Sequence, residues 1–413
     1  MLIHSTNYKP KIIPLKGDCD PANIDRAQGI DPTVTLNREK IKEIGNKDVV
    51  GYLKRSPTVT YRLTQHEYGS LEFYKKLANL PNSARVVTLD DFKDSTFDIC
   101  AYMFDDADVF KGTVVYPRLR LAGLSLGIGD PDAIISRTFD VAGEQAVIWQ
   151  GNNKYYIYLR DEVESGEETK TITIGQGEFA NYPDPVQDPI LGTYIVKLYR
   201  IRGNELQEPD FTYDNGTKTI TIQNCVTGDI IKVLYTASSY ITGQVPFEPN
   251  MNDLPALEAN SSSIYLYIPA AGKPSASDYI YRLQSITIDV RLDREDQKEL
   301  GNREVVVRGI RGKTVTVTLG RILESFKLEE VLSGRNPDFG KIDVQEFSSN
   351  ITLVVKLYSD YTKQTFKLGL KAKKLSPSDL RGGTAGIDAY VSQNNTLIGE
   401  DLIITDDESE LQE

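Results

Sequence analysis

Apolar and polar residues alternate along most of this chain, which is the pattern of β-strands that bury one face and expose the other. The clearest alternating runs are residues 33–36, 58–63, 285–292 and 314–319. A helical spacing of apolar residues appears at 67–80 and again at about 321–332, each time after a predicted strand. The pattern therefore predicts a mainly β protein with one α-helix in each half of the chain.

The two halves share one sequence pattern. Residues 36–63 align without gaps on residues 292–319, and 14 of the 28 positions are identical. Unrelated segments of ordinary composition would share roughly one or two positions. The same shift of 256 residues aligns Phe110 with Phe366 and Gly143 with Gly399. This self-similarity predicts a tandem duplication.

The repeat divides the chain into parts. We predict two copies of a β-sandwich or β-barrel domain, at 1–150 and 263–405. Alternating runs and an Asn-Gly turn signal predict an inserted small β domain at 151–245, and a proline-rich stretch predicts a linker at 246–262. We expect the acidic residues 406–413 to be disordered.

Composition narrows the class of protein. The formal net charge of −12 disfavours a protein that grips DNA phosphates with clustered lysine and arginine. The three cysteines are odd in number and far apart, which argues against a disulfide framework. No apolar run approaches the 18 or so residues of a membrane helix, and the first residues have no secretory signal pattern, so we expect synthesis and assembly in a cytoplasm.

Candidate chemistry is sparse. The histidines, His4 and His66, have no metal-binding spacing, and the glycine-rich stretch 123–129 lacks the lysine of a phosphate-binding loop. Adjacent acidic residues such as Asp90 and Asp91 point to opposite faces if they lie on a strand. We therefore expect no enzyme activity, no catalytic residues, no cofactor and no metal site.

The segment best retained between the two copies is a charged connection, REKIKEIGNKDVV in the first and REDQKELGNREVV in the second. A connection that only links two strands has little reason to keep its polar residues, so this retention favours an interaction surface. The alternative is an ordinary solvated hairpin tip.

The order strand, charged connection, strand and amphipathic helix resembles the major tail tube proteins of tailed phages. Residues 136–144 are also similar to the closing strand region of such proteins. The resemblance covers both copies, and it rests on this pattern rather than on an invariant motif.

The resemblance implies a structural virion protein of the viral tail, assembled in the host cytoplasm. Its β-barrels would form stacked rings, and a duplicated chain would close each ring as a homotrimer with pseudo-sixfold symmetry. A tape-measure protein would occupy the lumen during assembly, tail terminator and baseplate or tip proteins would cap the ends, and double-stranded DNA would pass non-specifically. The inserted domain would lie on the exterior, and no membrane or cofactor is implied.

The same resemblance implies that the retained connections reach the adjacent ring. The candidate ring-stacking residues are Lys42, Glu43, Gly45, Asn46, Lys298, Glu299, Gly301 and Asn302.

Two other readings stay open. One is a different virion component, such as a baseplate hub or a capsid-associated protein, which would not polymerise alone into long tubes. The other is a carbohydrate-binding surface protein, which the missing signal and the duplication of a connection rather than an acidic cleft disfavour.

Overall fold

The computed structural model describes most of the chain. The described residues are 8–17, 19–24, 26–41, 51–54, 57–107, 109–130, 132–150, 155–188, 192–203, 205–240, 256–268, 283–298, 305–323, 328–329, 332, 347, 350–380 and 391–412.

The prediction of a mainly β protein is confirmed, because strands joined in large antiparallel sheets dominate the described residues. The helix predicted at 67–80 is a shorter one, α1 (Glu72–Ala78), which ends where Asn79 adopts a left-handed conformation with φ 59°. The second helix cannot begin at 321, because β21 (Val305–Ile322) includes that residue. Most of its remaining range lies outside the described residues.

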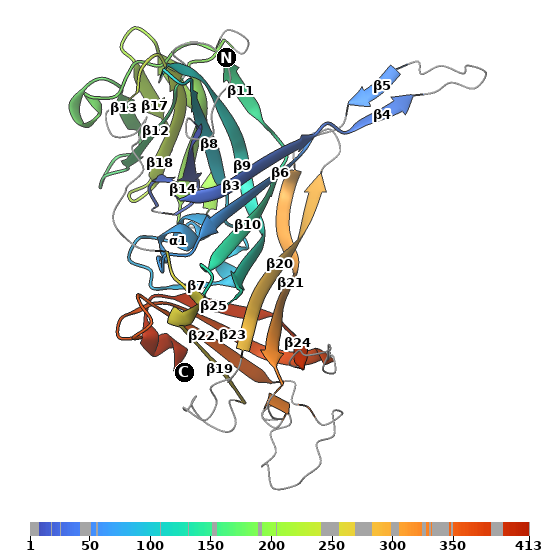
Figure 1. Cartoon of the computed structure of the whole chain (residues 1–413). Helices are drawn as coiled ribbons and strands as arrows, with labels where there is room; N and C mark the ends of the chain where they lie inside the picture. The colour runs from blue at the N-terminus through green and yellow to red at the C-terminus, as the bar shows by residue number, and fades with distance from the viewer. Residues whose placement is uncertain are drawn as a thin grey trace.

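One antiparallel sheet runs through both halves of the chain (Figure 1). We call it the long sheet. Its strands, in spatial order, are β23 (Phe366–Leu380), β24 (Ser392–Gly399), β21, β20 (Leu283–Lys298), β9 (Phe110–Ile128), β10 (Ser136–Gly143), β6 (Thr58–His66) and β3 (Ala27–Thr35).

Two strands of the long sheet also belong to a second layer. The first part of β9 pairs with β8 (Phe97–Phe104) and β11 (Val147–Gln150), and β8 pairs with β1 (Tyr8–Pro14), which also pairs with β2 (Ala22–Asn23). The first part of β23 pairs with β22 (Ile351–Tyr358) and β25 (Asp401–Thr405), and β22 pairs with β19 (Ser262–Tyr267). Each long strand therefore turns a corner between two layers.

The corner has the same backbone in both strands. Arg118 of β9 and Lys374 of β23 both have a φ of 55°, a left-handed conformation that is uncommon for residues other than glycine. These two residues are 256 positions apart. Such a local departure from strand geometry lets a strand bend sharply and change sheets.

Strand pairing also coincides at this shift. Ser136 lies opposite His66, and Ser392 lies opposite Ile322. Ala27 lies opposite Gln65 and Leu283 opposite Arg321, and in both pairs of strands the register then shifts by one residue. Residues 256 positions apart in the two halves are called counterparts below.

The core between the layers is continuous across both halves. Leu63, Phe139, Leu126, Ile288 and Val317 come from successive strands of the long sheet and belong to one cluster of buried side chains. Alternation along each strand places these residues on one face and leaves the other face polar.

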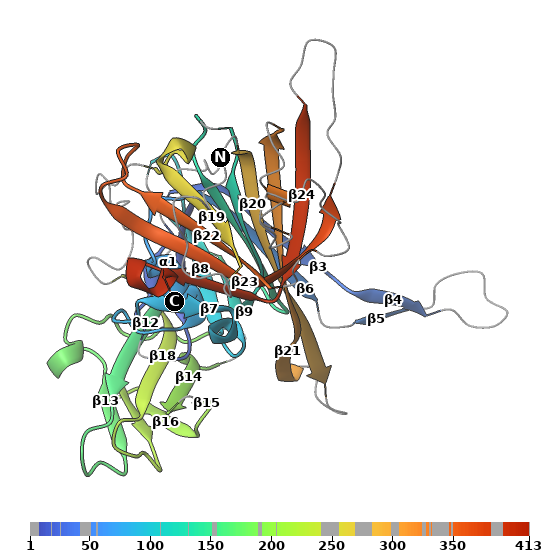
Figure 2. The ribbon, with the colours of Figure 1, turned by 90° about the horizontal axis from the view of Figure 1, so that it is seen from below.

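The residues between the halves form two sheets of their own at one end of the molecule (Figure 2). One sheet contains β12 (Tyr155–Glu162), β18 (Ile230–Ala237), β14 (Ile195–Arg202) and β15 (Glu205–Gln207). The other contains β13 (Lys170–Thr173), β17 (Thr219–Ile222) and β16 (Phe211–Asp214). Lys232 of β18 is fully buried and donates a hydrogen bond to the carbonyl of Pro14, 3.0 Å away, which ties this insert to the first half.

The end of the chain differs from the expected disordered tail at 406–413. Residues Glu408–Leu411 form a short 3-10 helix. The Asp407 carboxylate caps its start by accepting a hydrogen bond from the Ser409 amide. Leu411 is fully buried and packs with Tyr267 and Val354. A single apolar residue thus anchors a segment whose acidic composition alone predicts disorder.

The remaining short strands are β4 (Arg38–Ile41), which pairs with β5 (Gly51–Lys54), and β7 (Val86–Thr88), which pairs with β25. Part of the predicted linker is also packed against the first half, since the Leu257 amide donates to the Glu67 carbonyl at 2.7 Å.

Candidate functional site

The long sheet is the candidate functional feature. The face that turns away from the core, called the open face below, is not covered by the second layer. The edge strands of the sheet also expose apolar residues that are buried in their counterpart strands. Threonine predominates on the open face. The threonines there are Thr33, Thr35, Thr58, Thr60, Thr64, Thr138, Thr287, Thr314, Thr316, Thr318 and Thr396. β-Branched threonine favours extended backbone and gives this face a neutral, polar surface.

Charges on the open face alternate in sign along one row. Asp31 lies opposite Arg62, Arg62 lies opposite Asp140, and Asp140 and Arg291 both lie opposite Gly123. Arg62 Nε and Asp140 Oδ1 are 3.6 Å apart. Since each cation in the row has an acidic neighbour, the row does not form a continuous basic stripe of the kind that holds DNA.

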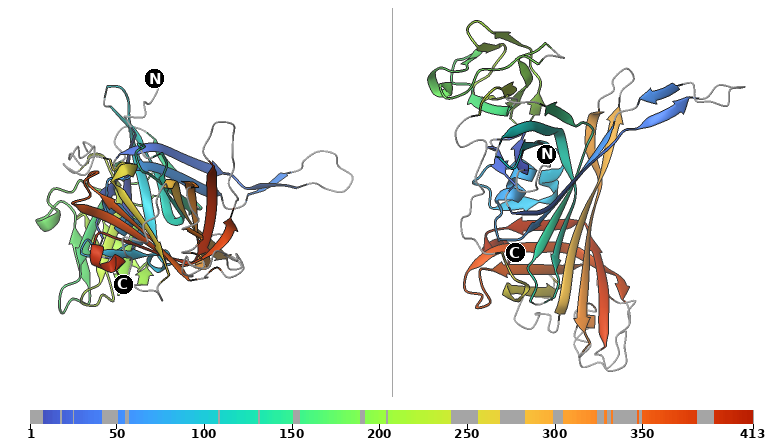
Figure 3. Two further views of the ribbon diagram at one scale, coloured as in Figure 1. Left: turned by 60° about the horizontal axis from the view of Figure 1, so that its bottom comes forward. Right: turned by 45° about the horizontal axis from the view of Figure 1, so that its top comes forward.

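The two halves meet at an internal joint between β20 and β9. Six residues of β20, from Ile286 to Arg291, pair with β9 from Ile128 back to Gly123. A second contact lies in the other layer, where Val87 of β7 lies opposite Ile404 of β25. The joint therefore links the halves in both layers, and Figure 3 shows the strands of the two halves side by side.

An arginine fastens the internal joint. Arg294 donates from Nε to the carbonyl of Leu121 at 2.7 Å, from Nη2 to that of Phe92 at 2.9 Å and from Nη1 to that of Lys93 at 3.2 Å. All three acceptors belong to the first half. The planar guanidinium suits such a multiple contact, because its N–H donors project in a fixed fork.

Among the described residues, the long sheet ends at β3 on one side and at the last part of β23 on the other, and these free edges are counterparts of the strands that meet in the joint. β3 is the counterpart of β20, and the last part of β23 is the counterpart of the last part of β9. Val34 is 40% exposed where Val290 is 4% exposed, and Leu36 is 61% exposed where Leu292 is 3% exposed. Apolar residues are thus buried where the joint covers them, and their counterparts are exposed at the free edge of the sheet.

The second layer repeats this contrast. Ile148 of β11 is 68% exposed, whereas its counterpart Ile404 of β25 is 1% exposed beneath β7. Within the part of the chain that the structure describes, the exposed apolar residues therefore lie where one half has a partner strand and the other half has none.

Buried ion pairs hold each half beneath the open face. Arg137 and Glu67 are fully buried with Nη1 and Oε2 3.1 Å apart, and the Tyr74 hydroxyl donates to the same carboxylate. In the other half, Arg321 bonds Glu329 at 2.7 Å. Gln65 pairs with Arg137 across the strands as Gln393 pairs with Arg321, so arginine and glutamine have exchanged strands between the halves.

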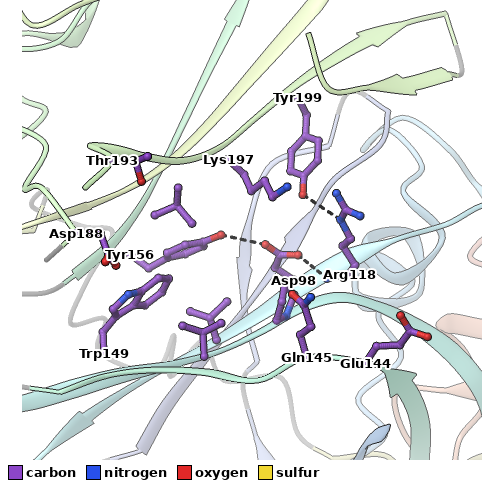
Figure 4. Close-up of a pocket in the computed structure, with 14 residues that line it drawn as sticks. Asp98, Arg118, Glu144, Gln145, Trp149, Tyr156, Asp188, Thr193, Lys197 and Tyr199 are labelled. Carbon is purple, nitrogen blue, oxygen red and sulfur yellow. Dashed lines mark hydrogen bonds between the residues drawn. The ribbon is translucent and has the colours of Figure 1, made fainter. Parts of the chain in front are cut away.

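A cavity of about 210 Å³ lies between the insert and the first half. Figure 4 shows Asp98 at its centre, accepting hydrogen bonds from the Tyr156 hydroxyl at 3.1 Å and from the Arg118 amide at 2.8 Å. Burial raises the pKa of the Asp98 carboxyl to about 6, although both hydrogen bonds oppose the shift. Trp149 and Tyr156 stack 5.2 Å apart on its apolar side.

Of the candidate ring-stacking residues, only Lys298 lies among the residues that the structure describes. Lys298 is the last residue of β20, opposite Val305, and nothing is described of its side chain. The other candidates lie outside the described residues: Lys42, Glu43, Gly45, Asn46, Glu299, Gly301 and Asn302. The strands that lead to them, β4 with β5 and β20 with β21, are paired as hairpins.

No model of a known protein family matches this sequence, and no curated protein matches it.

Within the described ranges, no three His, Cys, Asp or Glu side chains are grouped to hold a metal ion, and no helix there is long and apolar enough to cross a membrane. All three cysteines are buried thiols without a disulfide.

The sequence-based reasoning missed the residues of the internal joint. It selected the tips of the charged connections, whereas the described contacts lie at the base of the second connection, in Arg294, and in the preceding stretch of β20 from Ile286 to Arg291. A signal for Arg294 was present, because Arg38 and Arg294 are one of the identical pairs of the repeat.

Proposed function

We propose that this chain is a structural subunit made of two copies of one β domain, and that it polymerises into rings that stack as a tail tube. The equal registers, the equal corner residues Arg118 and Lys374, and the shift of 256 residues support the duplication.

One observation carries the proposal of a ring. The two halves are joined edge to edge through β20 and β9, and the free edges β3 and β23 are the counterparts of those strands. A chain whose two ends are complementary in this way can add further copies head to tail. If the rotation between copies closes, the long sheets merge into one wall without a free edge.

The open face supports a conduit for DNA. In the proposed ring the threonine-rich face lines the lumen, with the row of alternating charges across it. Neutral hydroxyls and paired charges would release few counterions from a passing duplex, so DNA would move without being held. The insert lies away from the open face and would decorate the outside of the tube.

Partners and location follow from the same proposal. The subunit would act without enzyme activity in a virion tail, around a tape-measure protein, between a tail terminator and the baseplate or tip. The retained connections beyond β4, β5 and the end of β20 would contact the next ring.

Negative-stain electron microscopy of the purified chain, with size-exclusion chromatography to define the species imaged, tests this proposal. We expect rings with a central hole, threefold averages and stacks of rings. A monodisperse monomer that persists at high concentration would contradict it.

A further inference from the structure

The two counterpart hairpins of the chain take different courses. β20 and β21 form one hairpin that continues through a register shift at Asp293 and Arg294. In the first half the same segment is broken, since β3 ends at Thr35 and β4 begins only at Arg38. The β4–β5 hairpin projects away from the body of the molecule (Figure 1).

The difference coincides with the presence of a neighbouring strand in the long sheet. β20 runs beside β9, and Arg294 fixes the base of its hairpin by donating to the carbonyls of Leu121, Phe92 and Lys93. Arg38, the counterpart of Arg294, is exposed at the base of the projecting hairpin. The apolar residues just before it, Val34 and Leu36, are exposed as well.

We propose that Arg38 and the β3 edge dock on the β23 edge of a second copy of this chain, as Arg294 and β20 dock on β9. The proposal rests on the head-to-tail assembly argued above and adds its register and its fastening residue. The β20–β21 hairpin of the second half then has the docked form, and the β4–β5 hairpin of the first half has the undocked form.

The internal joint fixes the register of the external one. Val290 lies opposite Leu124 and Arg291 opposite Gly123. The counterpart pairs are Val34 with Leu380 and Thr35 with Asp379 of the second copy. Arg38 would donate to the carbonyl of Pro377, the counterpart of Leu121, and draw the β4–β5 hairpin into line with β3.

Docking would bury the apolar residues that are now open. Val34 and Leu36 would reach the exposure of Val290 and Leu292, both below 5%. Docking of a second copy at this edge is therefore favourable, because it buries two aliphatic side chains and adds hydrogen bonds between the strands.

Mixed single-cysteine chains test the register. Chains carrying Thr35→Cys are mixed with chains carrying Asp379→Cys and oxidised, and dimers are read on a non-reducing gel. Directly opposite residues lie within disulfide range, so we expect dimers from the mixture and few from either chain alone. The native cysteines, all buried, provide a quiet background.

The matched control replaces Thr35→Cys by Thr33→Cys, which keeps the same face but shifts the pair by two residues to about 7–8 Å. Dimers in equal yield from both mixtures would overturn the register. Absence of dimers from chains that form rings in the microscope would overturn this inference and leave the tube intact. Dimers from chains that never form rings would support the docking and sink the tube.

The fastening role of Arg38 has its own test. We expect Arg38→Ala to raise the concentration at which the chain assembles at least tenfold, while the thermal unfolding of the monomer stays unchanged. Lys40→Ala removes another exposed cation from the same hairpin and should assemble like the wild type. Arg38→Lys should behave like the alanine variant, because an ammonium lacks the fork of donors. Wild-type assembly by Arg38→Ala would overturn the role.

Discussion

At the scale of single residues, close packing explains one retained glycine pair. A Cβ on Gly143 would stand 2.6 Å from Leu119 Cδ2, and a Cβ on Gly399 would stand 2.8 Å from Leu375 Cδ2. These are counterpart contacts, since both the glycines and the leucines are 256 residues apart. The alignment of the two halves identified the glycines but not their cause, because the leucine that excludes a side chain lies on the preceding strand, and an alignment does not show which residues of two paired strands touch.

We therefore expect Gly143→Ala to lower the free energy of unfolding by about 1–3 kcal/mol through overpacking against Leu119. Urea denaturation followed by circular dichroism measures the change. Gly129→Ala is the control, because a Cβ there meets nothing within 4 Å. Equal midpoints for the two variants would contradict the explanation.

The buried pair of Glu67 and Arg137 gives a second residue-level prediction. Glu67→Gln leaves the Arg137 guanidinium buried without a counter-charge, and we expect a loss of about 3–5 kcal/mol in unfolding free energy. Glu72→Gln, at the exposed first residue of α1, should change stability little. A loss below about 1 kcal/mol for Glu67→Gln would show that the cluster tolerates an unpaired arginine.

At the scale of elements, the sequence predicted which segments are strands but not how they pair. Alternation marked the strands near 58–63 and 314–319 because each has one buried face, as β6 and β21 do. The corner in β9 and β23 left no such mark, because Arg118 and Lys374 take a conformation that their residue type does not announce. The joint between β20 and β9 escaped notice for a related reason, since a periodicity within one strand carries no information about its neighbour.

Asp98 lies in the contact between the insert and the first half, where its carboxylate accepts a hydrogen bond from Tyr156 of the insert. Burial raises the pKa of this carboxyl from 3.8 to about 6, so its ionised form is less favourable in the folded chain than in the unfolded one. The penalty is absent below pH 4, grows as pH rises through the window from about 4 to 6, and is complete above it.

We expect Asp98→Asn to gain stability relative to the wild type by roughly 3 kcal/mol between pH 4 and pH 7, whatever its offset at pH 4. Thermal unfolding at a series of pH values measures the difference. Asp132→Asn, at an exposed position, serves as the control. A constant difference between Asp98→Asn and wild type across this window would refute the assignment.

At the scale of the whole molecule, the two halves differ in whether counterpart apolar residues are covered: they are buried in one half and exposed in the other. Ile148 and Ile404 are counterparts at 68% and 1% exposure. In the proposed ring both would be covered, Ile404 by its own chain and Ile148 by a neighbour.

The two isoleucines should therefore separate folding from assembly. Ile404→Ser removes a buried side chain, and we expect it to lower the unfolding free energy by about 2–5 kcal/mol. Ile148→Ser should leave monomer unfolding unchanged and weaken assembly, as measured by sedimentation velocity over a concentration series. Unweakened assembly of Ile148→Ser would remove β11 from the interface.

The internal joint also changes the thermodynamics of growth. Two separate domains that meet through an edge lose translational and rotational freedom at every contact, whereas β20 and β9 meet within one polypeptide and are held at a high effective concentration. In a ring built from this chain, half of the joints would form during folding of the chain and carry no concentration dependence. Such a subunit would begin to assemble at a lower threshold concentration than its halves expressed apart, and each ring would nucleate in fewer encounters.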